Sequence, residues 1–459
     1  MIALELPRLG AAAGVLAAYA VLCLQSWRQY RRLAGRTVTA SAADGVLIAY
    51  ASQSGFAAEL ADEAVQALGS AGAQATLLAL DQIDKRLLES FSSALFIVST
   101  CGEGDAPDNA ARFADTLMRE TARDETAELP LDLRYGLLAL GDRSYNHYCG
   151  FGRRLDAWLE SRGARRIFPR IEVDRANTEA LRAWRHQLAA FVGIAELDAL
   201  QLPATRPWRI RRSTLLNPGS VGAAVHHVEL EALADDASAE APNWEAGDLL
   251  QLYPADGDAY PRDYSIASLP EDGAVHLLVR RVIGADSNPG VMSSRLTAPD
   301  AVGTMVRGRI RSHQNFRIGD NSSRPLLLIG NGTGLAGLLA HLRQRARNGD
   351  GRNWLVFGER NAACDDFHGS ELDDLQGRDL LARCDRVFSR DLPAREYVQD
   401  RLLRAADTVR EWVSGGAAIY VCGNAVGMGP AVDEALRTIL GAETIAQLAL
   451  EGRYRRDIY

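Results

Sequence analysis

Short apolar runs that each end in a loop of small and polar residues constrain the fold of this 459-residue chain more than any other feature. Three of these runs come first, at 46–50, 94–98 and 135–140, and amphipathic segments separate them. Runs this short and apolar are typical of parallel strands whose sheet is covered by helices on both faces. The pattern therefore predicts a doubly wound α/β unit that ends near Gly193.

The rest of the chain divides into two further blocks. From Trp208 to about Arg311, short β-like runs broken by Gly, Pro and Asp predict an antiparallel barrel. From Pro325 the alternation of strand and helix returns, and a length about three times that of a usual domain leaves room for all three blocks. We predict an anchor with a basic segment at 1–40, an α/β domain at 45–195, a linker at 196–207, a β-barrel at 208–320 and a second α/β domain at 321–459.

Composition excludes several classes of protein. The net charge of −8 gives no basic surface for nucleic acid, and the 47% of hydrophobic residues is ordinary for a globular protein. Six cysteines without a C-x-x-C pair argue against a disulfide framework or a structural zinc site. The eight histidines show no metal-ligand spacing, so we predict no metal site. Lys85 is the only lysine among 51 basic residues, so any phosphate must be held by arginine, hydroxyl groups and backbone N–H groups.

The first forty residues contain a candidate membrane anchor. Nineteen uncharged residues run from Leu9 to Trp27, and as a helix they would span about 28 Å, close to the thickness of a bilayer's hydrocarbon core. Four arginines follow within 28–36, which predicts that the long C-terminal part of the chain lies in the cytoplasm. A cleaved signal peptide and a buried helix are the alternatives. We predict a single-pass membrane protein, in a bacterial inner membrane.

Three loops at the ends of the first three strands carry the chemistry of the first domain. They span 52–57, 99–108 and 140–149. Ligands of open α/β sheets bind at this edge, and the small residues of the first loop suit a phosphate at a helix N-terminus. Tyr145 is available to stack on a ring. Together the loops predict a flat, phosphorylated aromatic ligand.

These loops resemble the FMN-binding loops of the diflavin reductase family, which includes NADPH–hemoprotein reductase and the flavoprotein subunit of sulfite reductase. The third loop, Gly141 to Cys149, resembles the sulfite reductase type most closely. The resemblance implies a flavodoxin-like domain with FMN contacts at Ser52, Gln53, Ser54, Gly55, Ala57, Thr100, Gly102, Glu103, Gly104, Leu140, Gly141, Asp142 and Tyr145.

Two motifs in the predicted barrel resemble those of ferredoxin–NADP reductase modules. Arg262-Asp-Tyr264-Ser265 is similar to the R-x-Y-S motif, and the turn 290–296 is similar to the glycine turn that follows it. The resemblance implies that Arg262 and the turn (Gly290, Val291 and Ser293) hold the FAD pyrophosphate. It also implies that Tyr264 packs on the isoalloxazine and that Ser265 lies near its N5.

The last block carries a dinucleotide motif. Gly332, Gly334 and Gly337 fit G-x-G-x-x-G after a predicted strand, with Thr333 in the same turn. The resemblance implies that the 2′-phosphate of NADPH is bound by Ser389, Arg390, Arg395 and Tyr397. It further implies a hydride-transfer site formed by Ser265, Cys422, Asp457 and Tyr459, in which Tyr459 stacks over FAD.

The function that the resemblance implies is an NADPH-dependent flavoprotein oxidoreductase. Electrons would pass from NADPH to FAD, then to FMN, and then to a one-electron acceptor such as a hemoprotein. The alternatives are a membrane-associated ferric-chelate or quinone reductase, a sulfite reductase flavoprotein-like donor, and a flavin-binding scaffold without catalysis. Between Asp44 and Glu196 there are 23 acidic and 16 basic residues, which would favour a basic partner surface.

The chain departs from the family in three places. Phe56 replaces a hydroxyl residue that often binds the FMN phosphate, and Cys101 replaces a flavin-stacking aromatic residue. Only about fifty residues separate the predicted linker from Arg262. The helical connecting domain of the family therefore has no room, and the sequence does not indicate how the FMN domain reaches FAD.

Overall fold

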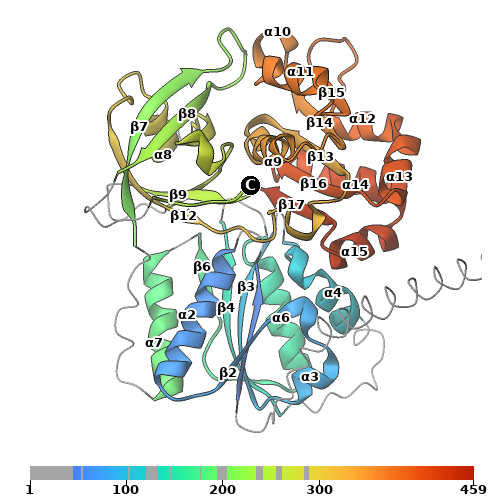
Figure 1. Ribbon diagram of the computed structural model, residues 1–459. Coiled ribbons are helices and arrows are strands. Elements are labelled where there is room, and N and C mark those ends of the chain that lie inside the picture. Colours follow the sequence, from blue (N-terminus) through green and yellow to red (C-terminus); the bar gives the residue numbers. More distant parts are fainter. Residues whose placement is uncertain are drawn as a thin grey trace, which may run out of the picture. The chain divides into compact units, whose positions relative to one another are not determined.

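The computed structural model describes residues 45–52, 55–101, 104–119, 132–143, 147–175, 177–193, 204–233, 241–254, 261–283 and 289–459. These residues belong to one unit, Gly45–Tyr459, and they form the three β-sheets drawn in Figure 1. The predicted α/β, barrel and α/β order is therefore confirmed at the level of sheets, while the exact domain boundaries stay predictions.

The first sheet is parallel, with the strand order β2-β1-β3-β4-β5 and with β6 also paired to β4. This is the order of flavodoxin-like domains. Its strands are β1 (Val46–Ala51), β2 (Ala75–Ala79), β3 (Ser93–Ser99), β4 (Arg134–Gly141), β5 (Arg165–Arg166) and β6 (Ile171–Asp174). Its helices are α2 (Phe56–Ser70), α3 (Lys85–Glu89), α4 (Ala111–Phe113), α6 (Gly150–Ser161) and α7 (Thr178–Val192).

Both faces of this sheet are buried. Ile48 and Leu95 pack with α2 and α7, whereas their neighbours Leu47 and Phe96 pack with α6. Successive side chains of a strand point to opposite faces, so a run that is apolar throughout needs a helix layer on each side. Figure 1 shows α2 and α7 on one side of the strands and α6 on the other. Burial on both faces is therefore the physical reason why these strands are continuous apolar runs in the sequence.

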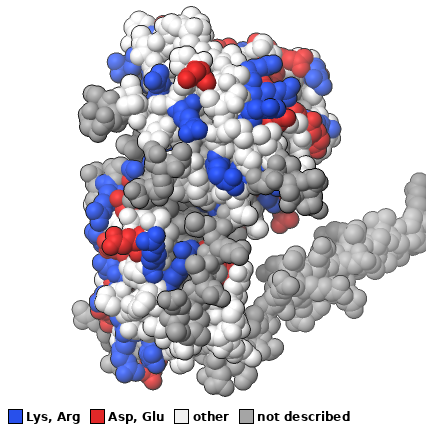
Figure 2. Space-filling view, turned by 90° about the vertical axis from the view of Figure 1, so that its left-hand side faces the viewer, with Lys and Arg blue, Asp and Glu red and all other residues white. Residues whose placement is uncertain are grey.

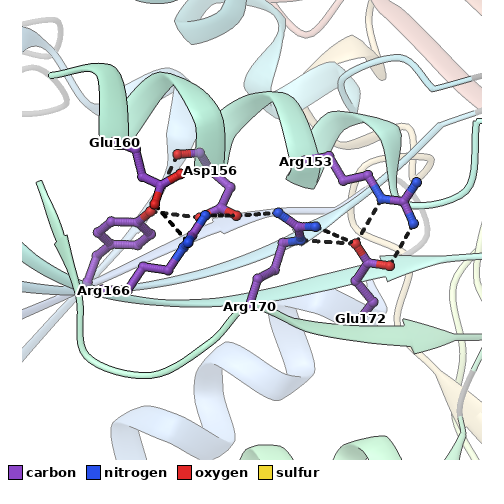
Figure 3. A network of polar contacts seen from close by, with 7 residues as sticks. Arg153, Asp156, Glu160, Arg166, Arg170 and Glu172 are labelled. Carbon is purple, nitrogen blue, oxygen red and sulfur yellow. Dashed lines mark hydrogen bonds and ion pairs between the residues drawn. The ribbon is translucent and has the colours of Figure 1, made fainter.

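A charge network holds the edge of this sheet to α6. Asp156 is fully buried in α6 and accepts hydrogen bonds from Tyr135 at 2.7 Å, from Arg166 at 2.9 and 2.8 Å, and from Arg170. Figure 3 shows these groups converging on Asp156. Burial raises the pKa of Asp156, but the hydrogen bonds from Arg166, Tyr135 and Arg170 outweigh it and leave the pKa lowered. A buried carboxylate is tolerated here because its partners compensate its charge.

Replacing Asp156 by asparagine is expected to lower the free energy of unfolding by about 2 kcal/mol, because two guanidinium groups lose a charged acceptor. The folded pKa is lowered, so the contribution is present above the unfolded pKa and is lost as pH falls below about 4. Urea unfolding at pH 7 and pH 3 measures both effects. Glu160→Gln is the control, since Glu160 also contacts Arg166 but is 48% exposed. Equal losses in the two variants would contradict this account.

The second sheet is antiparallel, with the order β10-β9-β12-β7-β8-β11. A bridge between Ile266 and Leu277 joins its two edges, so the sheet closes into the predicted barrel. Its core contains two tryptophans, Trp208 and Trp244. The elements are β7 (Arg206–Leu215), β8 (Val225–Ala232), β9 (Leu249–Tyr253), β10 (Arg262–Ser265), β11 (Val275–Arg280), β12 (Met305–Arg311) and the helix α8 (Val291–Leu296).

The third sheet is parallel, with the order β15-β14-β13-β16-β17. Val225 and Leu278 of the barrel belong to the same core as α9, so the barrel packs on this sheet. The strands are β13 (Leu326–Asn331), β14 (Asn353–Glu359), β15 (Arg383–Phe388), β16 (Ala418–Gly423) and β17 (Tyr454–Ile458). The helices are α9 (Leu335–Arg347), α10 (Ala362–Asp365), α11 (Gly369–Gly377), α12 (Val398–Arg404), α13 (Ala406–Ser414), α14 (Met428–Leu440) and α15 (Ala442–Leu450).

The predicted membrane location is corrected by the structure. None of the helices in the described part of the chain combines the length and the apolar character needed to cross a bilayer. The segment from Leu9 to Trp27, on which the prediction rests, lies outside the described residues. The membrane location is therefore not carried forward.

Candidate functional site

A cleft of about 890 Å³ lies between the barrel and the third sheet. Strand β10 forms one wall, and the carboxyl ends of β13, β14 and β15 form the other, which is the edge where α/β sheets bind ligands. The cleft is lined by these predicted site residues: Arg262, Tyr264, Ser265, Ser293, Gly332, Thr333, Ser389, Arg390, Arg395, Tyr397 and Tyr459. Residues from 262 to 459 thus converge on one cavity.

A buried polar group lies at the inner end of this cleft. Ser265 Oγ donates a hydrogen bond of 2.8 Å to Asp457 Oδ2, and Cys422 Sγ lies 3.5 Å from the same oxygen. Asp457 and Cys422 are neighbours because they pair in register across β16 and β17. Burial, then the Asp457 charge, raises the pKa of Cys422 well above its usual value, which keeps the thiol protonated. Sequence reasoning missed His313, whose Nδ1 lies 4.0 Å from Asp457 Oδ1, because no motif marks it.

The glycine turn after β13 needs its glycines for two reasons. Gly332 has a φ of 59°, which favours glycine, and a Cβ at Gly334 would lie 2.2 Å from the carbonyl oxygen of Cys422. A Cβ at Gly337 would lie 3.1 Å from Phe316, so this glycine lets α9 pack closely. Side chains at these positions would therefore block the close packing of the turn at the start of α9.

The turn before α8 is held by a serine. The Ser293 hydroxyl accepts a hydrogen bond from the Val282 N–H at 3.1 Å and donates one to the Gly290 carbonyl at 3.2 Å. A Cβ at Gly290 would lie 2.9 Å from the same hydroxyl oxygen. Val291 is 59% exposed at the start of α8. The serine thus shapes the turn from within, while its backbone is left to contact a ligand.

Two exposed arginines, Arg390 and Arg395, lie on the rim of the cleft. Figure 2 shows one face of the molecule, where arginine and lysine lie among aspartate and glutamate, and many arginines form ion pairs. Arg390 and Arg395 are exposed, and their guanidinium groups have no acidic partner among the described residues. Ser389 Oγ bonds the Glu359 carbonyl at 3.2 Å beside them, and Tyr397 is 43% exposed. Unpaired guanidinium groups suit a phosphate dianion.

The chain ends over the glycine turn. Tyr459 donates its backbone N–H to the Gly423 carbonyl at 3.0 Å, and its hydroxyl lies 3.2 Å from Thr333 Oγ1. Its side chain is half exposed on the wall of the cleft. The C-terminal residue is therefore fixed by its backbone, while its ring has room to move.

A second, smaller cavity of about 150 Å³ lies at the carboxyl edge of the first sheet. Three hydroxyl groups near it, Ser52 Oγ, Thr100 Oγ1 and Tyr148 Oη, are buried and have no hydrogen-bond partner within the described part of the chain. Buried hydroxyl groups are rarely left unpaired, so these atoms fit a ligand with polar edges such as FMN. Leu140, Gly141 and Asp142 also line this cavity.

The other residues predicted to bind in the first domain have different positions. Gly55, with a φ of 92°, starts α2, and Ala57 is buried within that helix. Gly104 has a φ of 109°. The predicted residues Gln53, Ser54, Gly102, Glu103 and Tyr145 lie outside the described residues.

Two aromatic residues line the cavity, and the sequence interpretation had not selected Tyr148 as a binding residue. Phe56 and Tyr148 line it, and Tyr148 follows Tyr145 in the same loop. Cys101, the predicted departure, is buried, and burial raises its pKa to about 12. The thiol is thus held in its protonated form, and Tyr148 is an aromatic residue that lines the cavity.

The loop edge of the first sheet is joined to the other two sheets by side-chain hydrogen bonds. Glu59 of α2 accepts a hydrogen bond of 2.6 Å from Arg309 of β12. Arg456 of β17 donates to Asp108 at 2.9 Å, and Asn315 donates to the Ser52 carbonyl at 3.0 Å. These contacts join residues up to 348 positions apart in the chain, and no sequence motif marks them.

Comparison with known proteins agrees with this geometry. The flavodoxin family model matches residues 48–186, and the oxidoreductase NAD-binding domain model matches residues 328–434. Similar proteins include the sulfite reductase [NADPH] flavoprotein alpha-components of Vibrio cholerae and Thiocapsa roseopersicina. The first is 28% identical over 549 aligned residues, which cover 92% of this chain and 89% of the relative. The second is 29% identical over 459 residues, which cover 88% and 85%.

The alignment with the Vibrio cholerae protein is longer than this whole chain, 549 residues against 459. The relative therefore carries insertions that this chain lacks. This agrees with the short distance between the predicted linker and Arg262, which leaves no room for a connecting domain.

Proposed function

This chain belongs to the diflavin reductase family, and from that premise we propose that it passes electrons from NADPH through FAD and FMN to a hemoprotein acceptor. The observation that carries the proposal is the single cleft in which the barrel motif 262–265 meets the glycine turn 332–334 and the chain end. The flavins, when bound, supply the hydride and one-electron chemistry, and the protein supplies binding, orientation and electrostatics.

The residues of the cleft have separable roles in this proposal. Arg262 and the turn before α8 hold the FAD pyrophosphate, and Arg390 and Arg395 hold the 2′-phosphate of NADPH. Asp457 fixes the Ser265 hydroxyl. The Asp457 carboxylate also places a negative charge where NADPH becomes positively charged as it loses hydride. In the first sheet, Ser52 and Thr100 offer hydroxyl groups to FMN.

The proposal is tested by the flavin content and the acceptor profile of the purified protein. We expect about one FMN and one FAD per chain, and NADPH-dependent reduction of cytochrome c. Rates with a sulfite-reducing hemoprotein, a ferric chelate and a soluble quinone separate the acceptors. The relatives' name, sulfite reductase flavoprotein, favours the hemoprotein. A protein that binds FAD but no FMN would contradict the proposed electron path.

The two unpaired arginines predict the nucleotide preference. Replacing Arg390 or Arg395 by alanine should raise KM for NADPH about tenfold and leave KM for NADH nearly unchanged, because a charge-assisted hydrogen bond to the 2′-phosphate is lost. Steady-state kinetics with both nucleotides measure the effect. Arg378→Ala is the control, since Arg378 is exposed on the surface and pairs with Asp374 at 3.0 Å. Equal losses with NADH and NADPH would rule out a 2′-phosphate contact.

A further inference from the structure

Three histidines meet where the barrel packs on the third sheet, outside the cleft. His227 lies in β8, His276 in β11 and His368 directly before α11. The ring of His227 lies 4.9 Å from that of His276 and 5.1 Å from that of His368, centroid to centroid. None of the three is among the residues that line the 890 Å³ cleft.

Strand register adds a carboxylate to this cluster. His227 and Glu229 are two residues apart in β8, so their side chains share a face. His276 pairs directly with Glu229 across the antiparallel ladder of β8 and β11. The potential ligand atoms of His227, Glu229 and His276 all lie within 4.8 Å of one another. The sequence showed no such grouping because spacing along the chain does not reveal cross-strand pairs.

Two imidazole nitrogens in this cluster point to a missing partner. His227 Nε2 and His276 Nδ1 are buried, and neither has a hydrogen-bond partner within the described part of the chain. Native proteins rarely leave buried polar atoms unpaired. Two such atoms beside one carboxylate are what a site for a metal ion would contain.

The tautomer of His227 follows from a chain of hydrogen bonds. Arg343 donates to both oxygens of Glu371, at 2.7 and 2.8 Å, which holds Glu371 as a carboxylate. His368 Nδ1 lies 3.0 Å from Glu371 Oε2, so that nitrogen carries the proton. A His368 ring that carries its proton on Nδ1 accepts at Nε2, which lies 3.2 Å from His227 Nδ1.

His227 therefore donates from Nδ1 and keeps a lone pair on Nε2. A carboxylate that orients a histidine in this way is the usual outer shell of a metal site, where it fixes the tautomer and the ring orientation.

We propose that His227, Glu229 and His276 bind a divalent transition-metal ion of the zinc type. Two imidazoles and a carboxylate are ligands that Zn²⁺ accepts, and three protein ligands leave a fourth position for water. Metal bonds of about 2.0–2.1 Å need the ligand atoms to approach by roughly 1 Å, which small side-chain rotations allow. Glu229 would turn from Arg212, which lies 3.4 Å away and is 66% exposed.

The bound ion would strengthen the junction between barrel and nucleotide-binding sheet. His368, Glu371 and Arg343 belong to the third-sheet side, and Arg343 also donates to the Ala267 carbonyl of the barrel at 2.8 Å. The bound ion would thus hold the barrel and the third sheet together through the hydrogen bonds of His368, Glu371 and Arg343. This inference stands apart from the proposed electron transfer, because it needs neither flavin nor NADPH.

Metal content is the measurement. The untagged, full-length protein is treated with dipicolinate, dialysed against Zn²⁺, and analysed by mass spectrometry and by competition with a chelating dye. We expect one Zn²⁺ per chain. His227→Ala and His276→Ala should each weaken binding at least about 100-fold. His226→Ala is the matched control, since its Nδ1 is bonded to Ser213 Oγ at 3.0 Å, away from the site.

A second variant tests the outer network. Glu371→Gln should weaken Zn²⁺ binding about tenfold or more, because the amide no longer fixes the His368 and His227 tautomers. The melting temperature and flavin content of each metal-free variant show whether it folds, and Glu229→Gln replaces any variant that does not. The proposal is overturned if the wild type holds less than about 0.1 Zn²⁺ per chain. It is also overturned if His276→Ala binds as tightly as His226→Ala.

Discussion

Replacing Asp457 by asparagine is expected to slow the bleaching of flavin absorbance by NADPH about 100-fold to 1000-fold, with flavin content unchanged. Asp457 holds the Ser265 hydroxyl at 2.8 Å and supplies the negative charge at the inner end of the cleft. Removal of a charged or hydrogen-bonding group aimed at developing charge costs about this much in rate. Stopped-flow absorbance at saturating NADPH measures the step directly.

Two further variants decide whether the pair acts as a unit. Ser265→Ala should slow the same step, and the double variant should be little worse than Asp457→Asn, because partners in one hydrogen bond are not additive. Ser268→Ala is the control, since its buried hydroxyl bonds the Ala274 carbonyl at 2.8 Å in the same barrel. If the rate loss of the double variant equals the product of the losses of the two single variants, Ser265 and Asp457 act independently.

Reversing the charge of Arg456 should slow electron delivery to an acceptor and leave flavin reduction by NADPH fast. In Arg456→Glu, two carboxylates face each other where Arg456 now binds Asp108, and juxtaposed like charges cost several kcal/mol. We expect cytochrome c reduction to fall about 100-fold. Flavin bleaching by NADPH should keep its fast phase, because the cleft is formed by the barrel and the third sheet.

The exchange variant Asp108→Arg/Arg456→Glu is the decisive control for this contact. It restores opposite charges in reversed order and should recover most of the cytochrome c activity. Arg378→Glu serves as the surface control, since Arg378 pairs with Asp374 at 3.0 Å and both side chains are exposed. If the exchange variant stays as slow as Arg456→Glu alone, the loss arises within β17 and not at the contact between sheets.

Much of the fold was predictable because its signals are local. The apolar runs at 46–50, 94–98 and 135–140 lie within β1, β3 and β4, and those at 326–329, 354–357 and 419–421 lie within β13, β14 and β16. Each run is apolar throughout because helices cover both faces of its sheet. The barrel was predictable only as a class, since its strand order depends on pairings between distant segments.

The motifs of the candidate site could be predicted from the sequence, but the way in which they come together in space could not. Arg262, Gly334 and Arg390 were selected from sequence, and the structure places them on or beside one cleft. The predicted membrane location was wrong, since no helix of the described residues is long and apolar enough to cross a bilayer, and the run on which it rested lies outside them. Tyr148 lines the cavity of the first sheet and was not selected from the sequence, whereas the predicted Tyr145 of the same loop lies outside the described residues.

The sequence by itself determined the strands, the glycine turns and the types of residue that bind phosphate, because each depends on interactions between residues a few positions apart. Gly332, for example, adopts a φ of 59°, which glycine reaches without steric cost. The tertiary structure alone decided which polar groups meet. Ser265 and Asp457 are 192 residues apart, His227 and His368 are 141 apart, and Asp108 and Arg456 are 348 apart. Such pairs form only when packing brings whole sheets together, and no local pattern carries that information.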